Sequence, residues 1–137
     1  MHDPLATIQR LVEATNAHDL ERLVACFADD YTLTAPSHPH RGFRGSDQVR
    51  RNWTHIFASV PDITTQLVRT TVDGDAVWTE WEMSGTRRDG ATHRMAGVFI
   101  FGVTDDRIGW GRMFLEPVDT TGGDIDAVVR AQVGVKL

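Results

Sequence analysis

Two carboxylates lie close together in a strongly apolar stretch of the chain, VWTEWEMSG. Glu80 and Glu82 alternate there with Trp81 and Met83. Paired carboxylates in apolar surroundings are suited to general acid–base chemistry. The same alternation is also typical of an ordinary half-buried strand that keeps its polar residues on one face. The facing of the two acids therefore decides whether this stretch indicates a catalytic site.

Other side chains that can do chemistry are few. His38 and His40 form an H-x-H pair in the Pro/Gly-rich loop PSHPHRGFRGS, where an imidazole can act as a general base. Two histidines without a third ligand indicate a metal site only weakly, and loop histidines are usually solvated. Arg94 is expected at a strand end, facing either solvent or a ligand. We therefore keep these three as candidate catalytic residues and predict no metal site and no cofactor.

The composition is that of a single globular domain. The chain has 137 residues, of which 41% are hydrophobic and 24% charged. The formal net charge is −5 and the basic residues are scattered, which disfavours nucleic-acid binding. No apolar run approaches the ~20 residues of a membrane span, and the start does not resemble a secretory signal. With Cys26 as the single cysteine, a cytoplasmic location is expected.

Hydrophobic periodicity separates a helical first half from a strand-rich second half. Helical spacing runs from Leu5 to Phe27, interrupted before Asp19, which is a plausible cap for a second helix. A strand, DYTLTAP, follows, and a third helix is expected to begin with Ser46 or Asp47 as its cap. Four strand-like runs come next, at 63–72, 76–88, 91–104 and 107–118.

This order predicts an α+β fold with three N-terminal helices packed on a curved, mainly antiparallel sheet. Residues 1–118 form one domain in this interpretation, and residues 119–137 form a C-terminal tail with a short helix.

Turn geometry predicts which side chains share a face of the sheet. Asp89-Gly90 and Asp105-Asp106 are taken as two-residue hairpin turns, and directly opposed residues then share a face. One face is uniformly apolar and suits the concave, ligand-holding side. It carries Thr79, Trp81, Met83, Ala96, Val98, Ile100, Met113 and Leu115.

The opposite face combines aromatic side chains with charges, a composition typical of protein interfaces. It carries Trp78, Glu80, Glu82, Phe99, Phe101, Trp110, Arg112, Phe114 and Glu116. We predict that a homodimer forms through this face, with a solvated face as the alternative. His93 has the same parity. In this interpretation the two glutamates are interface acids rather than catalytic ones.

The element order resembles the SnoaL-like branch of the nuclear transport factor 2 superfamily, over about residues 5–118. The resemblance is carried by NAHDLERLVACFADDYTLTAP, HRGFRGSDQVRRNW and MAGVFIFGVTDDRIGWGRMFLEPV. It implies a cone-shaped barrel with a pocket, and dimerisation through the outer sheet face is frequent in this family. It does not imply one activity, because the family mixes isomerases, cyclases, dehydratases, epoxide hydrolases and non-enzymes.

The catalytic residues of two relatives are replaced here. The ketosteroid isomerase base falls on Ala35, and its oxyanion donors fall near Leu11 and Val98. The polar groups of limonene epoxide hydrolase fall on apolar residues: Leu33, Ala35, Trp81, Met83 and Met113. Neither standard mechanism is therefore expected. The resemblance also places Leu11, Leu33 and Ala35 in the pocket, and Trp53 is either a core residue or a pocket donor.

Two functions remain open on the sequence alone. The first is a small enzyme of cyclase, isomerase or hydrolase type, acting on an apolar molecule. The second is a non-catalytic binder or accessory protein that holds a hydrophobic ligand in the same cavity. A titratable side chain inside the cavity would favour the enzyme.

Overall fold

The computed structural model describes residues 3–135. The helices are α1 (Pro4–Asn16), α2 (Leu20–Ala25), the short 3₁₀ helix η1 (Pro39–Arg41), α3 (Ser46–Ser59) and α4 (Ile125–Gln132). The strands are β1 (Phe27–Thr34), β2 (Phe43–Arg44), β3 (Thr64–Asp73), β4 (Ala76–Thr86), β5 (Thr92–Thr104) and β6 (Arg107–Pro117). The predicted α+β class is confirmed, with three helices preceding a four-strand meander.

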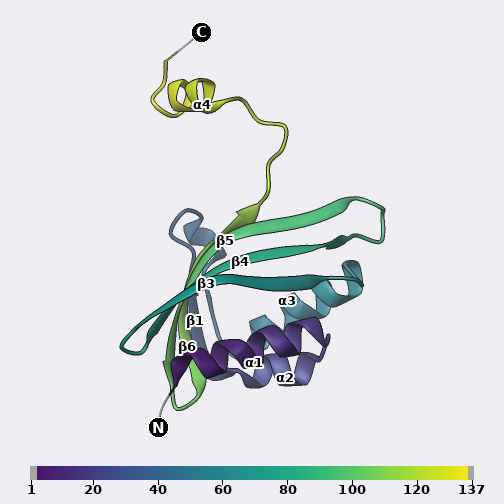
Figure 1. The fold of residues 1–137 in the computed structure, drawn as a ribbon, viewed down its shortest axis with the longest axis vertical. Coiled ribbons are helices and arrows are strands. Elements are labelled where there is room, and N and C mark those ends of the chain that lie inside the picture. Colours follow the sequence, from purple (N-terminus) through teal and green to yellow (C-terminus); the bar gives the residue numbers. More distant parts are fainter. Residues whose placement is uncertain (1–2, 136–137) are drawn as a thin grey trace.

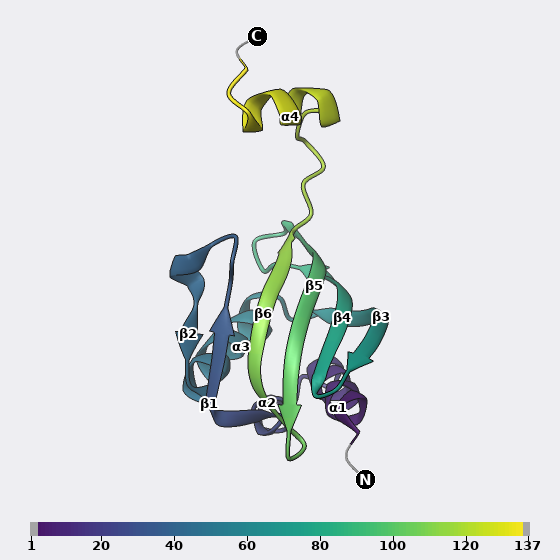
Figure 2. The ribbon, with the colours of Figure 1, turned by 90° about the vertical axis from the view of Figure 1, so that its left-hand side faces the viewer.

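The strands form one six-stranded sheet in the order β2-β1-β6-β5-β4-β3. All neighbours are antiparallel except β1 and β6, which run parallel. Figure 2 shows the sheet curving from β2 on one side to β3 on the other. Because the first strand inserts next to the last, the sheet bends around a core instead of continuing as an open meander.

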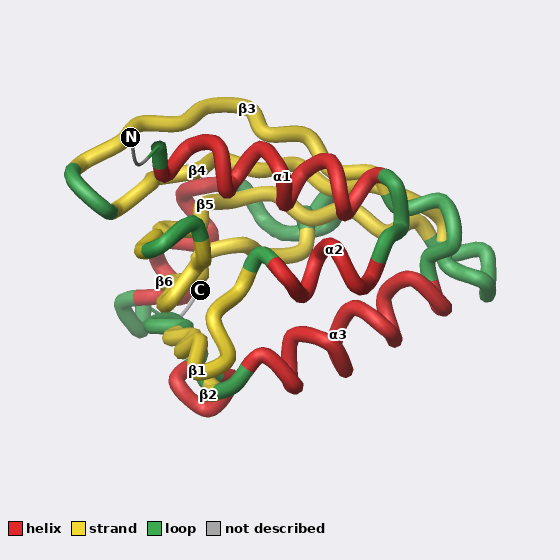
Figure 3. The backbone as a smooth tube through the Cα atoms, turned by 90° about the horizontal axis from the view of Figure 1, so that it is seen from below, coloured by secondary structure: helices red, strands yellow, loops and turns green. Residues whose placement is uncertain are grey.

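The helices α1, α2 and α3 lie side by side against one face of the sheet (Figure 3). Asp3 and Asp19 cap α1 and α2, since their carboxylates accept from the backbone N–H groups of Leu5 and Arg22. The predicted N-cap of α3, Ser46 or Asp47, is wrong. The helix begins at Ser46, and its N-cap is Gly45, which has φ +102°. Apolar side chains of α1 and α2 are fully buried under the sheet, among them Ile8 and Leu23.

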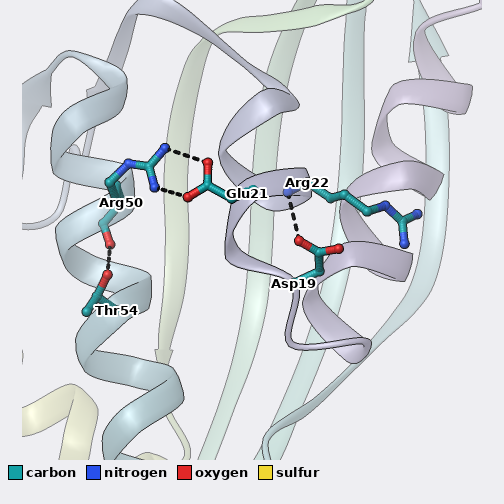
Figure 4. Close-up of polar contacts among 5 residues, drawn as sticks. All are labelled: Asp19, Glu21, Arg22, Arg50 and Thr54. Carbon is teal, nitrogen blue, oxygen red and sulfur yellow. Dashed lines mark hydrogen bonds and ion pairs between the residues drawn. The ribbon is translucent and has the colours of Figure 1, made fainter.

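Polar contacts fix the helices relative to one another and to the sheet edge. The guanidinium of Arg50 on α3 donates two hydrogen bonds to the carboxylate of Glu21 on α2 (Figure 4). Asn16, the last residue of α1, donates to the Thr65 carbonyl at 3.0 Å and accepts from its N–H at 2.7 Å. The helical layer is therefore tied both to itself and to strand β3.

The turn between β4 and β5 is longer than the sequence interpretation assumed. The N–H of Arg87 donates to the Ala91 carbonyl and Gly90 adopts φ +86°, which leaves three residues in the loop. Trp81 consequently pairs with Gly97 rather than Val98. A slip of one residue reverses the facing of a whole strand, so the predicted facing of β5 is wrong.

A second slip restores the facing of β6. The two-residue turn at Asp105-Asp106 is confirmed, and both residues have positive φ. Gly109 then bulges out of the ladder, because Val103 pairs with Ile108 while Gly102 pairs with Trp110. Strands β4 and β6 therefore present the residues predicted for each face, and only β5 between them is reversed.

The C-terminal tail leaves the sheet at the end of β6 and carries α4 away from the body (Figures 1 and 2). Asp124 caps this helix, since its carboxylate accepts from the Ala127 N–H. Its apolar side chains are largely exposed, including Ile125 and Val129. Within residues 3–135, no helix has the length and apolarity required to cross a membrane.

Candidate functional site

A cavity of about 210 Å³ lies between the concave face of the sheet and the helices. It is smaller than the ~300–1,000 Å³ of typical small-molecule sites, so it suits a compact ligand or part of a longer one. Most of the lining is apolar or aromatic. The lining residues are Leu11, Thr15, Phe27, Tyr31, Leu33, Phe43, Val49, Asn52, Trp53, Ile56, Ile63, Trp81, Met83, His93, Met95, Phe99, Phe101, Met113 and Leu115.

Seven of the residues predicted to line the pocket do so in the structure: Leu11, Leu33, Trp53, Trp81, Met83, Met113 and Leu115. Two further predicted residues are buried without lining it. Ala35 lies in the core at the end of β1, and Thr79 lies beside Trp81 as its hydrogen-bond partner.

The reversed facing of β5 accounts for the pocket predictions that are wrong. Ala96, Val98 and Ile100 pair with Glu82, Glu80 and Trp78 on the outer face. Phe99 and Phe101, predicted for a dimer interface, instead line the cavity, where their rings stack at 4.8 Å. The interface prediction is corrected for these two residues.

The three candidate catalytic residues do not reach the cavity. Arg94 pairs with Ser84 and is exposed on the outer side of β5, not on the concave side that its predicted parity required. His38 contacts the Glu116 carboxylate at 2.9 Å, so this imidazole faces the end of β6. His40 is exposed on η1.

Four polar side chains that the sequence interpretation missed do line the cavity: His93, Tyr31, Asn52 and Thr15, whose hydroxyl already donates to the Leu11 carbonyl at 2.7 Å. His93 was assigned to the outer face because of the assumed two-residue turn. Tyr31 has the parity of Leu33 on the same strand, and this signal was available. Asn52 lies one helical turn from Val49 on α3 and shares its inner face.

Tyr31 and His93 are the titratable groups among the residues that line the cavity. The Tyr31 side chain is 2% exposed, and burial raises the pKa of its hydroxyl well above the ordinary tyrosine value. It therefore stays a neutral hydrogen-bond donor at physiological pH. No carboxylate lines the cavity, and the described residues contain no cluster of three potential metal ligands.

Glu80 and Glu82 lie on the outer face, as the β4 alternation predicted, and neither lines the cavity. Glu80 contacts Arg69 of β3 at 3.9 Å. The same face exposes Trp78, Trp110 and Phe114. The carboxylate pair is therefore not an acid–base pair inside the pocket.

Solved structures share this architecture over nearly the whole chain. IdmH, a candidate polyketide cyclase from Streptomyces antibioticus, is 26% identical, with a TM-score of 0.71 and coverage of 98% of this chain and 100% of that one. An LEH-like epoxide hydrolase from M. tuberculosis is 19% identical, with a TM-score of 0.71 and coverage of 96% of both chains. A candidate ketosteroid isomerase from Kribbella flavida is 17% identical, with a TM-score of 0.68 and coverage of 91% and 86%.

No curated protein sequence is significantly similar to this chain. The sequence profile of the SnoaL-like domain, however, matches residues 8–109. This range begins within α1, runs through β5 into the first part of β6, and includes most of the cavity wall. The chain therefore belongs to the SnoaL-like domain family.

Proposed function

We propose that this chain is a small enzyme of the cyclase or isomerase kind that acts on a compact, mainly apolar substrate held in the cavity. The observation that carries the proposal is the position of His93. It is the one imidazole among the described residues that line the apolar cavity. An imidazole can both accept and donate a proton near neutral pH, as such rearrangements require.

The apolar walls would contribute by excluding water and by holding the substrate in a reactive shape. Phe99, Phe101 and Trp81 provide rigid aromatic surfaces for this purpose. The likeness to IdmH, at 26% identity over the full length of both chains, supports a polyketide-type substrate as the class to test first.

The standard catalytic mechanisms of ketosteroid isomerase and limonene epoxide hydrolase are not alternatives to this proposal. The resemblance implies that Ala35 falls at the position of the isomerase base and that Trp81 and Met83 fall at polar positions of the hydrolase. Apolar side chains at these positions cannot move protons or activate water. His93 is therefore the group in the cavity best suited to proton transfer.

A turnover assay with matched histidine variants tests the proposal. Purified protein is screened by thermal shift against aromatic and polyketide-like ketones, and stabilising compounds are then assayed for conversion. We expect His93→Gln to lower kcat about 100-fold or more, as is typical when a general acid–base group is removed. His55→Gln, which changes an exposed histidine on α3, should retain wild-type kcat. Equal activity in the two variants would reject His93 as the proton-transfer group.

Aliphatic and aromatic side chains make up most of the cavity lining among residues 3–135, which favours a second candidate, a non-catalytic binder of a hydrophobic ligand. The same screen separates the two functions. Tight binding without conversion of any stabilising compound, unchanged in His93→Gln, would favour the binder.

The outer face of the sheet supports a further proposal, that two copies associate through it. Trp78, Trp110 and Phe114 are 47%, 41% and 37% exposed there, next to Arg112. Exposed aromatic residues mixed with charges are characteristic of protein interfaces. With the corrected facing of β5, Ala96, Val98 and Ile100 join this face in place of Phe99 and Phe101.

A further inference from the structure

The hydroxyl of Tyr31 is a hydrogen-bond donor without a partner among the described residues. It lines the cavity, and the structure shows no hydrogen bond from it to any of residues 3–135. The ring is held edge-on against Phe27 at 4.7 Å and lies 6.0 Å from Phe43. The oxygen itself is not fully enclosed, since Thr65 Oγ1 is the only completely buried side-chain polar atom without a partner among residues 3–135. The hydroxyl can therefore donate to an acceptor that enters the cavity.

Gly111 makes room for this hydroxyl. A Cβ at position 111 would lie only 2.4 Å from the Tyr31 oxygen. The absence of a side chain on β6 thus allows the hydroxyl to lie against the sheet backbone inside the cavity. Packing against Phe27, Phe43 and Gly111 therefore fixes the position of the Tyr31 hydroxyl.

Asn52 provides a second donor, because a chain of hydrogen bonds fixes its amide. The guanidinium of Arg51, which can only donate, contacts Gln48 Oε1 at 2.6 Å. Gln48 must then turn its Nε2 toward Asn52, and it donates to Asn52 Oδ1 at 2.8 Å. Because Asn52 Oδ1 already accepts this hydrogen bond, Asn52 Nδ2 remains available as a donor to a molecule in the cavity that Asn52 lines.

The two donors come from different walls, Tyr31 from β1 and Asn52 from α3, and both border the same apolar cavity. We propose that Tyr31 and Asn52 together bind the carbonyl oxygen of an otherwise apolar ligand. A neutral carbonyl matches two neutral donors, whereas a carboxylate would lose its hydration with no lysine or arginine among the described lining residues to compensate. This inference rests on the proposed function in requiring an apolar molecule in the cavity, and it narrows the substrate class to ketones, enones and esters.

A pair of probes that differ by one carbonyl tests the inference. 1-Tetralone and its parent hydrocarbon tetralin have the same ring system, and binding of each is followed by quenching of the cavity tryptophans Trp53 and Trp81. We expect Tyr31→Phe to weaken 1-tetralone binding about 3- to 10-fold, the effect of losing one hydrogen bond. Tetralin should bind this variant equally or more tightly, because no hydroxyl is then left unpaired. Asn52→Leu should likewise weaken the binding of 1-tetralone without weakening the binding of tetralin.

The carbonyl stretching band of bound 1-tetralone gives an independent readout. It should lie at lower frequency in the wild type than in Tyr31→Phe, since a hydrogen bond weakens the C=O bond. Equal losses for ketone and hydrocarbon, or an unchanged band, would show that Tyr31 acts only through packing and would overturn the inference. If neither probe binds the wild-type protein, the inference and the apolar-ligand proposal both fail. If tetralin binds as tightly as 1-tetralone in every variant, only the donor pair fails.

Discussion

The indole N–H of Trp81 donates a 2.6 Å hydrogen bond to the hydroxyl of Thr79, two residues earlier on the same strand. Both side chains are buried, and the Thr79 hydroxyl in turn donates to the Phe99 carbonyl at 2.7 Å. The indole of Trp81, which lines the cavity, is therefore fixed by a polar contact to its own strand and, through it, to β5. Trp81 leaves no free donor for a ligand, which distinguishes it from Tyr31.

Replacing this hydroxyl should destabilise the fold. Thr79→Val keeps the shape of the side chain but leaves the Trp81 N–H without an acceptor, at a cost of about 1–3 kcal/mol. Thr79→Ser retains the hydroxyl and should recover most of that loss. Urea unfolding of both variants measures the difference. Equal stability of Thr79→Val and wild type would contradict the importance of the contact.

Two glycines on β6 provide a matched pair. Gly111→Ala places a methyl group against the Tyr31 hydroxyl and should destabilise the fold by about 1–3 kcal/mol through overpacking. Gly109→Ala is the control, since a Cβ there meets nothing within 4 Å. Its free energy of unfolding should change by no more than about 0.5 kcal/mol. Thermal and urea unfolding report both values, and similar losses in the two variants would argue against the close approach.

The Glu21–Arg50 contact between α2 and α3 should make stability depend on pH. The hydrogen bond from Arg50, and then its positive charge, hold the pKa of Glu21 below its ordinary value. A lowered folded-state pKa stabilises the fold above the unfolded value of ~4.3, and this contribution is lost as the pH falls through the lower folded value. Glu21→Gln should therefore reduce the Tm at pH 7, by a margin that disappears in acid.

A double-mutant cycle assigns this pH dependence to the pair. Arg50→Gln should reproduce the effect of Glu21→Gln, and the double variant should be no less stable than either single one. Tm values measured between pH 7 and pH 3 are sufficient. Additive losses would mean that the two side chains act separately.

The proposed dimer face predicts a change of oligomeric state. Phe114→Glu introduces a charge among the exposed aromatic residues of the outer face, and we expect a monomer by sedimentation velocity. Val72→Glu is the control, because Val72 is 46% exposed on β3 and pairs with the inward-facing Val77. A dimer that persists in Phe114→Glu would place the contact elsewhere.

The tail boundary predicts that residues 119–137 contribute little to the stability of the domain. The apolar residues of α4 are exposed, and the helix stands away from the sheet (Figure 1). Truncation after Val118 should leave the Tm within about 2 °C of the full chain, because little apolar area is lost from the core. A larger fall would show that the tail packs on the domain or on a second copy.

Periodicity in the sequence was sufficient to predict the fold, but not to predict which residues line the cavity. Apolar spacing located the α-helices and the strands β1 and β3 to β6 to within a few residues, whereas η1 and β2 lie in the segment predicted as a loop. The facing of β4 was correct for Trp81 and Met83. The facing of β5 depended on whether Asp89-Gly90 formed a two-residue turn or the end of a three-residue loop. Both are compatible with the same residues, because glycine accepts the positive φ that either needs.

The wrong facing of β5 affected the predicted site more than the predicted fold, because the chemistry of the site depends on which side chains face the cavity. His93 was placed outside and Arg94 inside, and the structure shows the reverse. The pairing of Trp81 with a residue of β5 is decided by hydrogen bonds between distant segments, which local spacing does not report. Tyr31 required only the alternation of β1, so its position could have been predicted.

The three-residue loop between β4 and β5 gives this scaffold a simple route to new specificity. Loss of one loop residue would reverse the facing of β5. In the cavity wall, Arg94, Ala96 and Val98 would then replace His93, Met95 and Phe99. A basic, roomier site would then replace an aromatic one without any substitution in a strand. A single-codon deletion could thus shift such a protein from neutral toward acidic ligands, which offers one physical reason why so many activities share this architecture.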